Sequence, residues 1–175
     1  MQKELARNID RFSVLGIDPG IATTGFAIVE KEEDRINLVS YGVIRTNKGA
    51  ELGKRLGILY ENLDDIFKNH QIDFVSIEKI FFNTNLKTVV SVSEARGVIL
   101  LASHIHKKQV FEYTPLEAKK TVVGFGRASK VEVQNTLKAI LNLDTVPKPD
   151  DAADAIAIAL CHIYSYNFYS RTIDD

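Results

Sequence analysis

Four acidic side chains of this 175-residue chain stand at the edges of apolar segments, where acids are normally avoided. Asp18 closes the apolar run FSVLGID, and Glu78 closes the run IDFVSIE. Asp151 and Asp154 open a segment that is otherwise Ala, Ile and Leu, and their i, i+3 spacing places both on one helical face. Because a buried carboxylate without a partner is costly, these four residues, called the acid cluster below, point to one shared site.

The chemistry of such a site follows from its charge. Carboxylates without a paired Arg or Lys repel one another, and a hard divalent cation with oxygen ligands relieves that repulsion. If the two strands are neighbours in a sheet, Asp18 and Glu78 point into one crevice, to which the last helix brings the other two acids. Two Mg²⁺ ions about 3.5–4 Å apart stabilise the attacking and leaving oxygens of a phosphodiester displacement. The acid cluster therefore predicts metal-assisted phosphoryl chemistry.

Each acid also has an ordinary structural explanation. Asp18 precedes Pro-Gly and fits a turn, and Glu78 fits a surface position at a strand end. Asp150 and Asp151 fit the start of a helix, where the helix dipole favours acids, and we expect Asp150 to cap that helix. We expect His162, on the apolar last helix, to be a packing or hydrogen-bonded residue. Four separate coincidences explain the pattern less well than one site does.

The elements that must position the acids follow the order βββαβαβααα. Alternating or apolar runs predict strands, and apolar residues at steps of three or four predict helices. Thr114 and Ser129 each begin a capping box that opens a further helix. The expected strands are 12–18, 26–30, 36–45, 72–78 and 109–113, and the expected longer helices are 50–67, 88–106 and 150–164. This order predicts an α/β fold with a mixed five-stranded sheet, an antiparallel meander plus parallel strands, flanked by helices.

The order of the elements predicts one domain over 12–168, after a short extension at 1–11 and before a polar tail at 169–175. Composition further limits the class of protein. No apolar stretch of membrane-spanning length is present, the first residues lack the apolar core of a signal peptide, and the one cysteine cannot form an intrachain disulfide. We therefore expect a cytoplasmic protein that does not enter a membrane.

The net charge of −1 argues mildly against nucleic acid as a partner, but the charge is unevenly spread. Residues 107–138 hold seven basic and three acidic side chains, whereas residues 141–175 hold two basic and six acidic ones. Because DNA responds to the local field, the neutral total is compatible with DNA binding. It predicts weak binding to plain duplex and reliance on DNA shape and on metal.

Five segments in order resemble the RuvC family of bacterial Holliday-junction resolvases, over about residues 13–163. They are LGIDPGIATTGFAIVE, VSIEKIFFNTN, SEARGVILLA, FEYTPLEAKKTVVGFGRASKVEVQ and PKPDDAADAIAIALCH. The resemblance implies an RNase H-like fold and a homodimer that resolves four-way DNA junctions in recombination and repair. It implies paired symmetric nicks that leave 5′-phosphate and 3′-hydroxyl ends, and two Mg²⁺ ions per active site, for which Mn²⁺ substitutes.

The resemblance also implies roles for individual residues. Asp18 would be shared between both metals, the nucleophile would be a metal-activated water, and segment 91–102 would be the dimer helix. The RuvA–RuvB branch-migration complex is a further partner that it leaves open. The implied site residues are Asp18, Glu78, Asp151 and Asp154 as catalytic metal ligands, Phe81 as the ring that stacks on bases, and Lys119 and Lys130 as phosphate-binding residues.

Three alternatives remain open at this point. The strand-turn-strand pattern GID-x-G-x-x-x-T-G also resembles the phosphate loop of the actin, Hsp70 and sugar-kinase superfamily. A junction-binding module without catalysis is a second alternative, although none of the four acids has been lost. The third is an RNase H-like nuclease that acts on RNA or on RNA–DNA hybrids.

Overall fold

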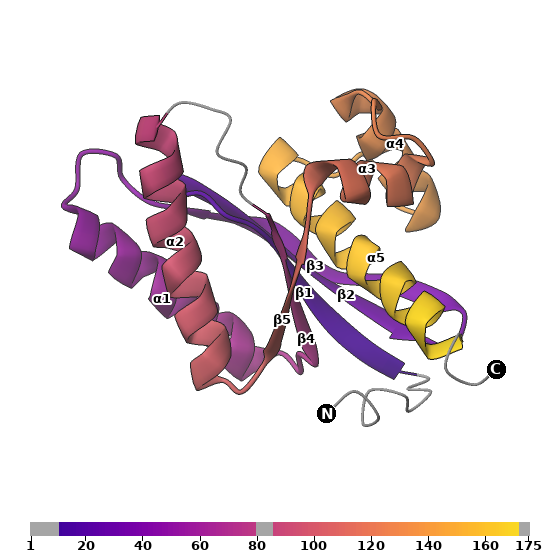
Figure 1. Ribbon diagram of the computed structural model, residues 1–175, viewed down its shortest axis with the longest axis horizontal. Helices are drawn as coiled ribbons and strands as arrows, with labels where there is room; N and C mark the ends of the chain where they lie inside the picture. Colours follow the sequence, from indigo (N-terminus) through magenta and orange to yellow (C-terminus); the bar gives the residue numbers. More distant parts are fainter. Residues whose placement is uncertain (1–10, 80–85, 172–175) are drawn as a thin grey trace.

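The computed structural model describes residues 11–79 and 86–171. It contains one mixed sheet of five strands in the order β3-β2-β1-β4-β5. The strands are β1 (Arg11–Asp18), β2 (Thr23–Glu32), β3 (Arg35–Arg45), β4 (Phe74–Glu78) and β5 (Gln109–Tyr113). The helices are α1 (Leu52–Asn69), α2 (Leu86–Ile105), α3 (Pro115–Val123), α4 (Lys130–Ile140) and α5 (Asp150–Arg171). Helices α1 and α2 cover one face of the sheet, and α5 crosses the other (Figure 1).

The predicted element order and the predicted mixed sheet are both confirmed. Strands β1, β2 and β3 pair antiparallel, while β4 pairs parallel with both β1 and β5. Both predicted capping boxes are present, because Thr114 accepts a hydrogen bond from the Glu117 amide and Ser129 accepts one from the Glu132 amide. The division into an extension, a domain and a tail stays a prediction.

Two elements extend by three residues or more past a predicted end, and the other predicted bounds differ by at most two residues. Strand β2 begins at Thr23 instead of 26, because its pairing with β3 starts at Thr23 opposite Arg45. Helix α5 continues to Arg171, past the predicted end at 164, and the buried ring of Tyr166 packs there with its centroid 5.0 Å from that of Phe12. Although α5 is strongly apolar, no helix in the described part of the chain is long and apolar enough to cross a membrane.

The sheet separates two cores, as the alternation of side chains along β1 shows. Phe12 and Val14 belong to the core under α3, α4 and α5. Leu15 and Ile17 belong to the core under α1 and α2. Since successive side chains of a strand point to opposite faces, Asp18 shares the face of Val14 and lies on the side of α5.

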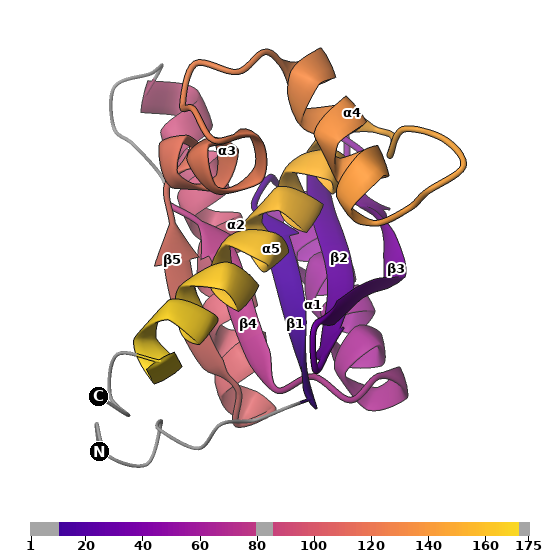
Figure 2. The ribbon, with the colours of Figure 1, turned by 90° about the vertical axis from the view of Figure 1, so that its right-hand side faces the viewer.

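Two glycines allow α5 to lie unusually close to the sheet. A Cβ atom at Gly16 of β1 would lie 2.2 Å from the carbonyl oxygen of Ala155, and one at Gly25 of β2 would lie 1.9 Å from that of Asp151. No side chain fits in either space. Figure 2 shows the result, in which the first turns of α5 rest on the upper ends of β1 and β2.

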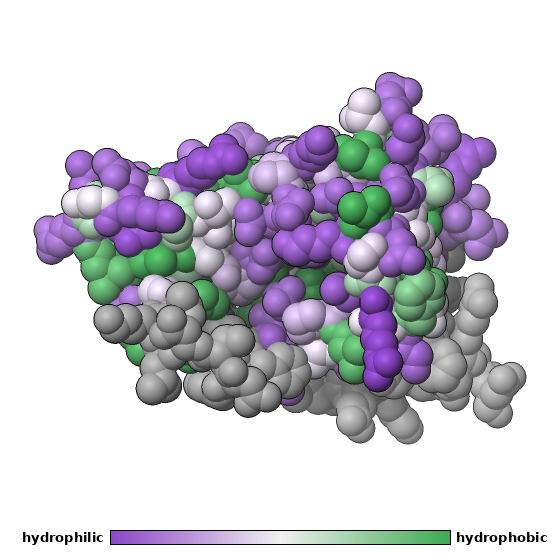
Figure 3. Space-filling model, turned by 90° about the horizontal axis from the view of Figure 1, so that it is seen from above, coloured by the Kyte–Doolittle hydropathy of each residue, from purple (hydrophilic) through white to green (hydrophobic). Residues whose placement is uncertain are grey.

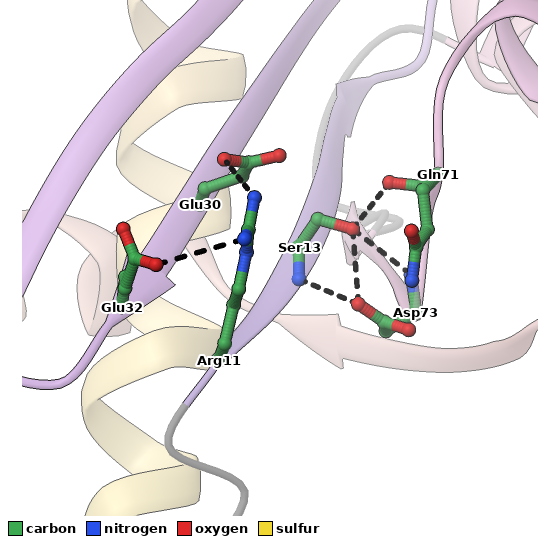
Figure 4. Close-up of polar contacts among 6 residues, drawn as sticks. All are labelled: Arg11, Ser13, Glu30, Glu32, Gln71 and Asp73. Carbon is green, nitrogen blue, oxygen red and sulfur yellow. Dashed lines mark hydrogen bonds and ion pairs between the residues drawn. The ribbon is translucent and has the colours of Figure 1, made fainter.

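The opposite end of the sheet is fastened by a polar contact between β1 and the start of β4. The backbone amide of Ser13 donates to the Asp73 carboxylate at 2.8 Å, and the Asp73 amide donates back to the Ser13 carbonyl at 3.0 Å. The Ser13 hydroxyl also donates to the carbonyl oxygen of Gln71 (Figure 4). These bonds fix the parallel register of β1 and β4, so the two strands also end side by side.

We predict that Gly25→Ala lowers the free energy of unfolding by about 1–3 kcal/mol, the usual cost of inserting an atom into a filled space. The added methyl group would meet the Asp151 carbonyl and push the start of α5 off the sheet. Urea unfolding measures the change. Gly57→Ala in α1 is the matched control, because a Cβ there has open space and should raise stability by about 0.5–1 kcal/mol. Equal stability of the Gly25→Ala variant and the parent protein would contradict the close packing.

Candidate active site

The four residues of the acid cluster converge from three elements. Asp18 and Glu78 are the last residues of the parallel neighbours β1 and β4, whose register pairs the residues just before them, Ile17 with Ile77. Asp18 pairs on its other side with Gly25, the residue over which the Asp151 backbone lies. Asp154 follows one helical turn later on the same face of α5. The predicted convergence of all four acids is therefore present.

The acids raise one another's pKa. Burial, together with the charges of Glu78, Asp154 and Asp151, raises the pKa of Asp18 to about 8. Burial and the charge of Asp154 raise the pKa of Glu78 to about 7. Burial also raises the pKa of Asp154. A partly buried set of like charges is unstable on its own and therefore favours protonation or a bound cation.

Two lysines border the acid cluster. The positive charges of Lys119 and Lys130 both lower the pKa of Glu78 and of Asp154, opposing the effect of burial. The Lys119 ammonium also donates to the carbonyl oxygen of Ala128 at 3.2 Å. The structure therefore places both positive charges near the acid cluster.

The expectation that Asp150 caps α5 is wrong. Asp150 is already the first helical residue, and Pro149 occupies the position before it. Its carboxylate instead accepts hydrogen bonds from Lys130 at 3.1 Å and from Gln134 at 2.9 Å. The bond to Lys130 is the main reason that the pKa of Asp150 is lowered. Asp150 thus ties α5 to α4 and holds Lys130 beside the acids.

The donor set of the acid cluster fits a hard divalent cation. All four side chains offer carboxylate oxygens, which Mg²⁺ and Mn²⁺ prefer, and their mutual repulsion is the kind that a cation removes. Among the described residues, no three His, Cys, Asp or Glu side chains lie close enough together to hold one ion. The acids are therefore neighbours, and their side chains would have to move closer together to share a cation.

The expectation for His162 is confirmed. The ring is buried, its Nδ1 lies 2.8 Å from the hydroxyl oxygen of Tyr113, and it packs 4.2 Å from the Phe111 ring centroid. Burial lowers the pKa of His162 to about 4, so the ring is neutral at pH 7. Because Tyr113 pairs with Glu78 in the sheet, this contact between α5 and β5 supports the strand next to the acids.

One predicted site residue lies outside the described part of the chain, and three residues that shape the site were not predicted. Phe81 lies outside the described residues. The spacing rules overlooked Gly16 and Gly25 as the positions where α5 approaches, and Gln134 as a partner of Asp150. Glycines inside two otherwise β-forming runs were the available signal for the first two, since such glycines often mark a close approach. Nothing in the sequence marked Gln134.

One face of α2 presents apolar side chains that nothing in the described part of the chain covers. Val90, Leu101 and Ile105 are 58%, 55% and 50% exposed, and helical spacing places them on one side. Gly97 shares that side and has open space at its Cβ position. Ala95 of the same helix is fully buried in the core under α1 and α2. Helix α2, which contains segment 91–102, therefore has one buried and one exposed apolar side.

Residues 14–162 match the family described as crossover junction endodeoxyribonuclease RuvC. The proteins of that name from Alkaliphilus metalliredigens and Caldanaerobacter subterraneus subsp. tengcongensis are 49% and 48% identical, over 90% of this chain and 96% of each relative. A solved structure of T. thermophilus RuvC in complex with Holliday junction substrate has a TM-score of 0.86 at 29% identity, and covers 91% of this chain and 97% of its own. A yeast mitochondrial Holliday junction resolvase, at 15% identity and a TM-score of 0.65, shares the fold. The expected RNase H-like arrangement is confirmed.

We predict that the metal-free protein loses stability as the pH rises from about 4 to about 8. In this window the folded protein holds protons on Asp18 and Glu78 that the unfolded chain has lost, because the folded pKa values are about 8 and about 7. Asp18→Asn removes the larger of the two effects. At pH 8 in EDTA it should raise the free energy of unfolding by about 2 kcal/mol. This value is smaller than the energy equivalent of the full pKa shift of Asp18, at about 1.4 kcal/mol per pKa unit.

Urea unfolding at pH 5 and pH 8 provides the measurement. Asp65→Asn on the exposed side of α1 is the control and should follow the parent protein at both values. If the parent protein has equal stability at pH 5 and pH 8, the acids are not crowded. The same conclusion follows if Asp18→Asn is less stable than the parent protein at pH 8.

Proposed function

Because this chain belongs to the RuvC family, we propose that it is a structure-selective endonuclease that resolves four-way DNA junctions by paired symmetric nicks. The observation that carries the proposal is the convergence of Asp18, Glu78, Asp151 and Asp154 within a chain that matches the family over residues 14–162. The T. thermophilus relative was solved in complex with a Holliday junction substrate. Membership in this family disfavours the alternative of a nucleotide-binding phosphate loop.

The proposed chemistry is hydrolysis that leaves 5′-phosphate and 3′-hydroxyl ends. The four acids would hold two Mg²⁺ ions, or Mn²⁺ in their place, with Asp18 shared because it lies between Glu78 and the start of α5. When bound, the ions supply an activated water and stabilise the leaving oxygen. The raised pKa values of Asp18 and Glu78 support this role, because they report crowded negative charge that a cation offsets.

The other residues of the site act on the DNA. Lys119 and Lys130 would bind phosphate near the cut, since the positive charges of both already act on Glu78 and Asp154. Asp150 keeps Lys130 in place through its hydrogen bond. Burial lowers the pKa of His162 to about 4, which makes the ring a weak base, and we assign it to the packing of α5. Phe81 remains the proposed base-stacking residue.

Two symmetric nicks call for two active sites related by two-fold symmetry, and we propose a homodimer. The exposed apolar face of α2 formed by Val90, Leu101 and Ile105 is the surface that supports it, because a two-fold interface brings the same patch of both copies together. Gly97 on that face allows the two helices to approach closely. A cytoplasmic location and the RuvA–RuvB complex as partner stay predictions.

We predict that the protein nicks synthetic four-way junctions in Mg²⁺ and not in EDTA, and cuts linear duplex at least about tenfold more slowly. Asp18→Asn should bind junctions but lose cleavage by a factor of about 10³ or more, because it removes one metal-ligand charge and keeps the shape. Gel assays of cleavage and mobility shift measure both. Asp65→Asn is the matched control and should cut at the parental rate. Parental cleavage by Asp18→Asn, or equal cutting of duplex and junction, would contradict the proposal.

We predict that Leu101→Asp produces a monomer, because it places a charge in the centre of the exposed α2 face. Multi-angle light scattering gives the mass. Val39→Asp, on a strand at the edge of the sheet where the side chain is 45% exposed, is the control and should remain a dimer. A Leu101→Asp variant that keeps the mass of a dimer would place the interface elsewhere.

A further inference from the structure

The turn between α3 and α4 exposes an aromatic ring. Phe125 is 50% exposed, and two apolar neighbours, Leu116 and Val131, are 61% and 64% exposed. Seen from above, apolar side chains lie among hydrophilic ones at this end of the molecule (Figure 3). None of these three side chains belongs to the proposed metal site.

The exposure of Phe125 is built into the turn. Gly124 ends α3 in the left-handed conformation, with φ of 91°, and its amide donates to the Lys120 carbonyl at 2.9 Å. Gly126 folds back onto Leu116, where a Cβ atom would lie 2.1 Å from the leucine side chain. With a helix cap before it and a close contact after it, the ring of Phe125 is presented outward by a fixed backbone.

The turn is attached to the edge of the active site. Lys119, whose positive charge lowers the pKa of Glu78 and of Asp154, donates a hydrogen bond to the carbonyl of Ala128 at 3.2 Å. Ala128 is three residues from Phe125, and Lys130 follows it at the start of α4. One ammonium group thus contacts the turn and also acts on the acids.

The charge around the ring favours a polyanion. Residues 115–140 contain five basic and two acidic side chains. Both acids, Glu117 and Glu132, accept hydrogen bonds at the helix starts, which lowers the pKa of each and directs its charge at the backbone. Lys119 and Lys130 already contact Ala128 and Asp150, whereas Arg127 is exposed and pairs with no acid in the described part of the chain. An exposed aromatic ring among basic groups is the combination that binds unpaired bases.

We propose that residues 124–128 form a second DNA-contacting element, in which the Phe125 ring packs on an unpaired base and Arg127 holds the adjoining phosphate. The inference rests on the proposed function and assigns a contact that neither the metal site nor Phe81 supplies. The unpaired bases are those at the branch point, because a paired base has both faces covered by its neighbours.

Fluorescence anisotropy with a labelled four-way junction tests the contact, in the Asp18→Asn background so that the DNA stays intact. Phe125→Ala should weaken binding about tenfold, as loss of one stacked base does. Phe125→Trp should retain binding, and Phe125→Leu should bind as weakly as Phe125→Ala, because it keeps apolar area without a flat ring. Tyr41→Ala, at another partly exposed aromatic on β3, is the matched control and should bind like the parent.

A salt titration separates the two kinds of contact. Phe125→Ala should leave the slope of log K against log[salt] unchanged, whereas Arg127→Gln should reduce it by about 0.9, the value for one lost phosphate contact on duplex DNA. Thermal unfolding of Phe125→Ala close to that of the parent protein verifies that the fold is kept.

The outcomes distinguish this inference from the proposed function. If the parent protein binds and cuts junctions while Phe125→Ala and Phe125→Leu do so equally well, the ring does not touch DNA and the inference is overturned alone. An unchanged slope for Arg127→Gln overturns the phosphate contact. If the parent protein binds no junction, the proposed function and this inference are overturned together.

Discussion

The packing of α5 against β1 and β2 is the contact on which the rest of the structure depends. Gly16 and Gly25 have no side chain, so the helix backbone rests directly on the two strands. The same contact lowers Asp151 and Asp154 onto the end of β1, where Asp18 lies opposite Gly25. The position of the acids is thus set by backbone packing and strand register, which are stiff, instead of by a loop.

This arrangement has an electrostatic cost that the site requires. Acids held together in a partly buried space carry raised pKa values, about 8 for Asp18 and about 7 for Glu78. A protein selected only for stability would replace at least one of them, and a site that destabilises the fold is a common mark of function. Lys119 and Lys130 offset part of this negative charge, and Asp150 holds Lys130 through a hydrogen bond.

Structural features that depend on residues close together in the sequence were predicted correctly. The element order, the capping boxes at Thr114 and Ser129, and the buried role of His162 were all predicted, because periodicity and helix-start chemistry act over a few residues. The convergence of the acids was predicted because strand ends in a parallel pair meet at one edge. Contacts between distant segments were not predicted. Asp150 pairs with Lys130 and Gln134 of another helix, and α5 continues past its apolar run to where Tyr166 packs against Phe12 of β1 on the same face of the sheet.

Calorimetric titration of the protein with Mn²⁺, repeated in buffers with different heats of ionisation, measures how many protons leave the acid cluster when a cation binds. Since metal ligands must lose their protons, we expect a release of about one proton per site at pH 7, where Asp18 and Glu78 are still partly protonated. That release should fall towards zero at pH 9, and Asp18→Asn should abolish most of it. Tight Mn²⁺ binding with no proton release at pH 7, or the same release from Asp18→Asn, would contradict an active site made of crowded, mutually repelling carboxylates.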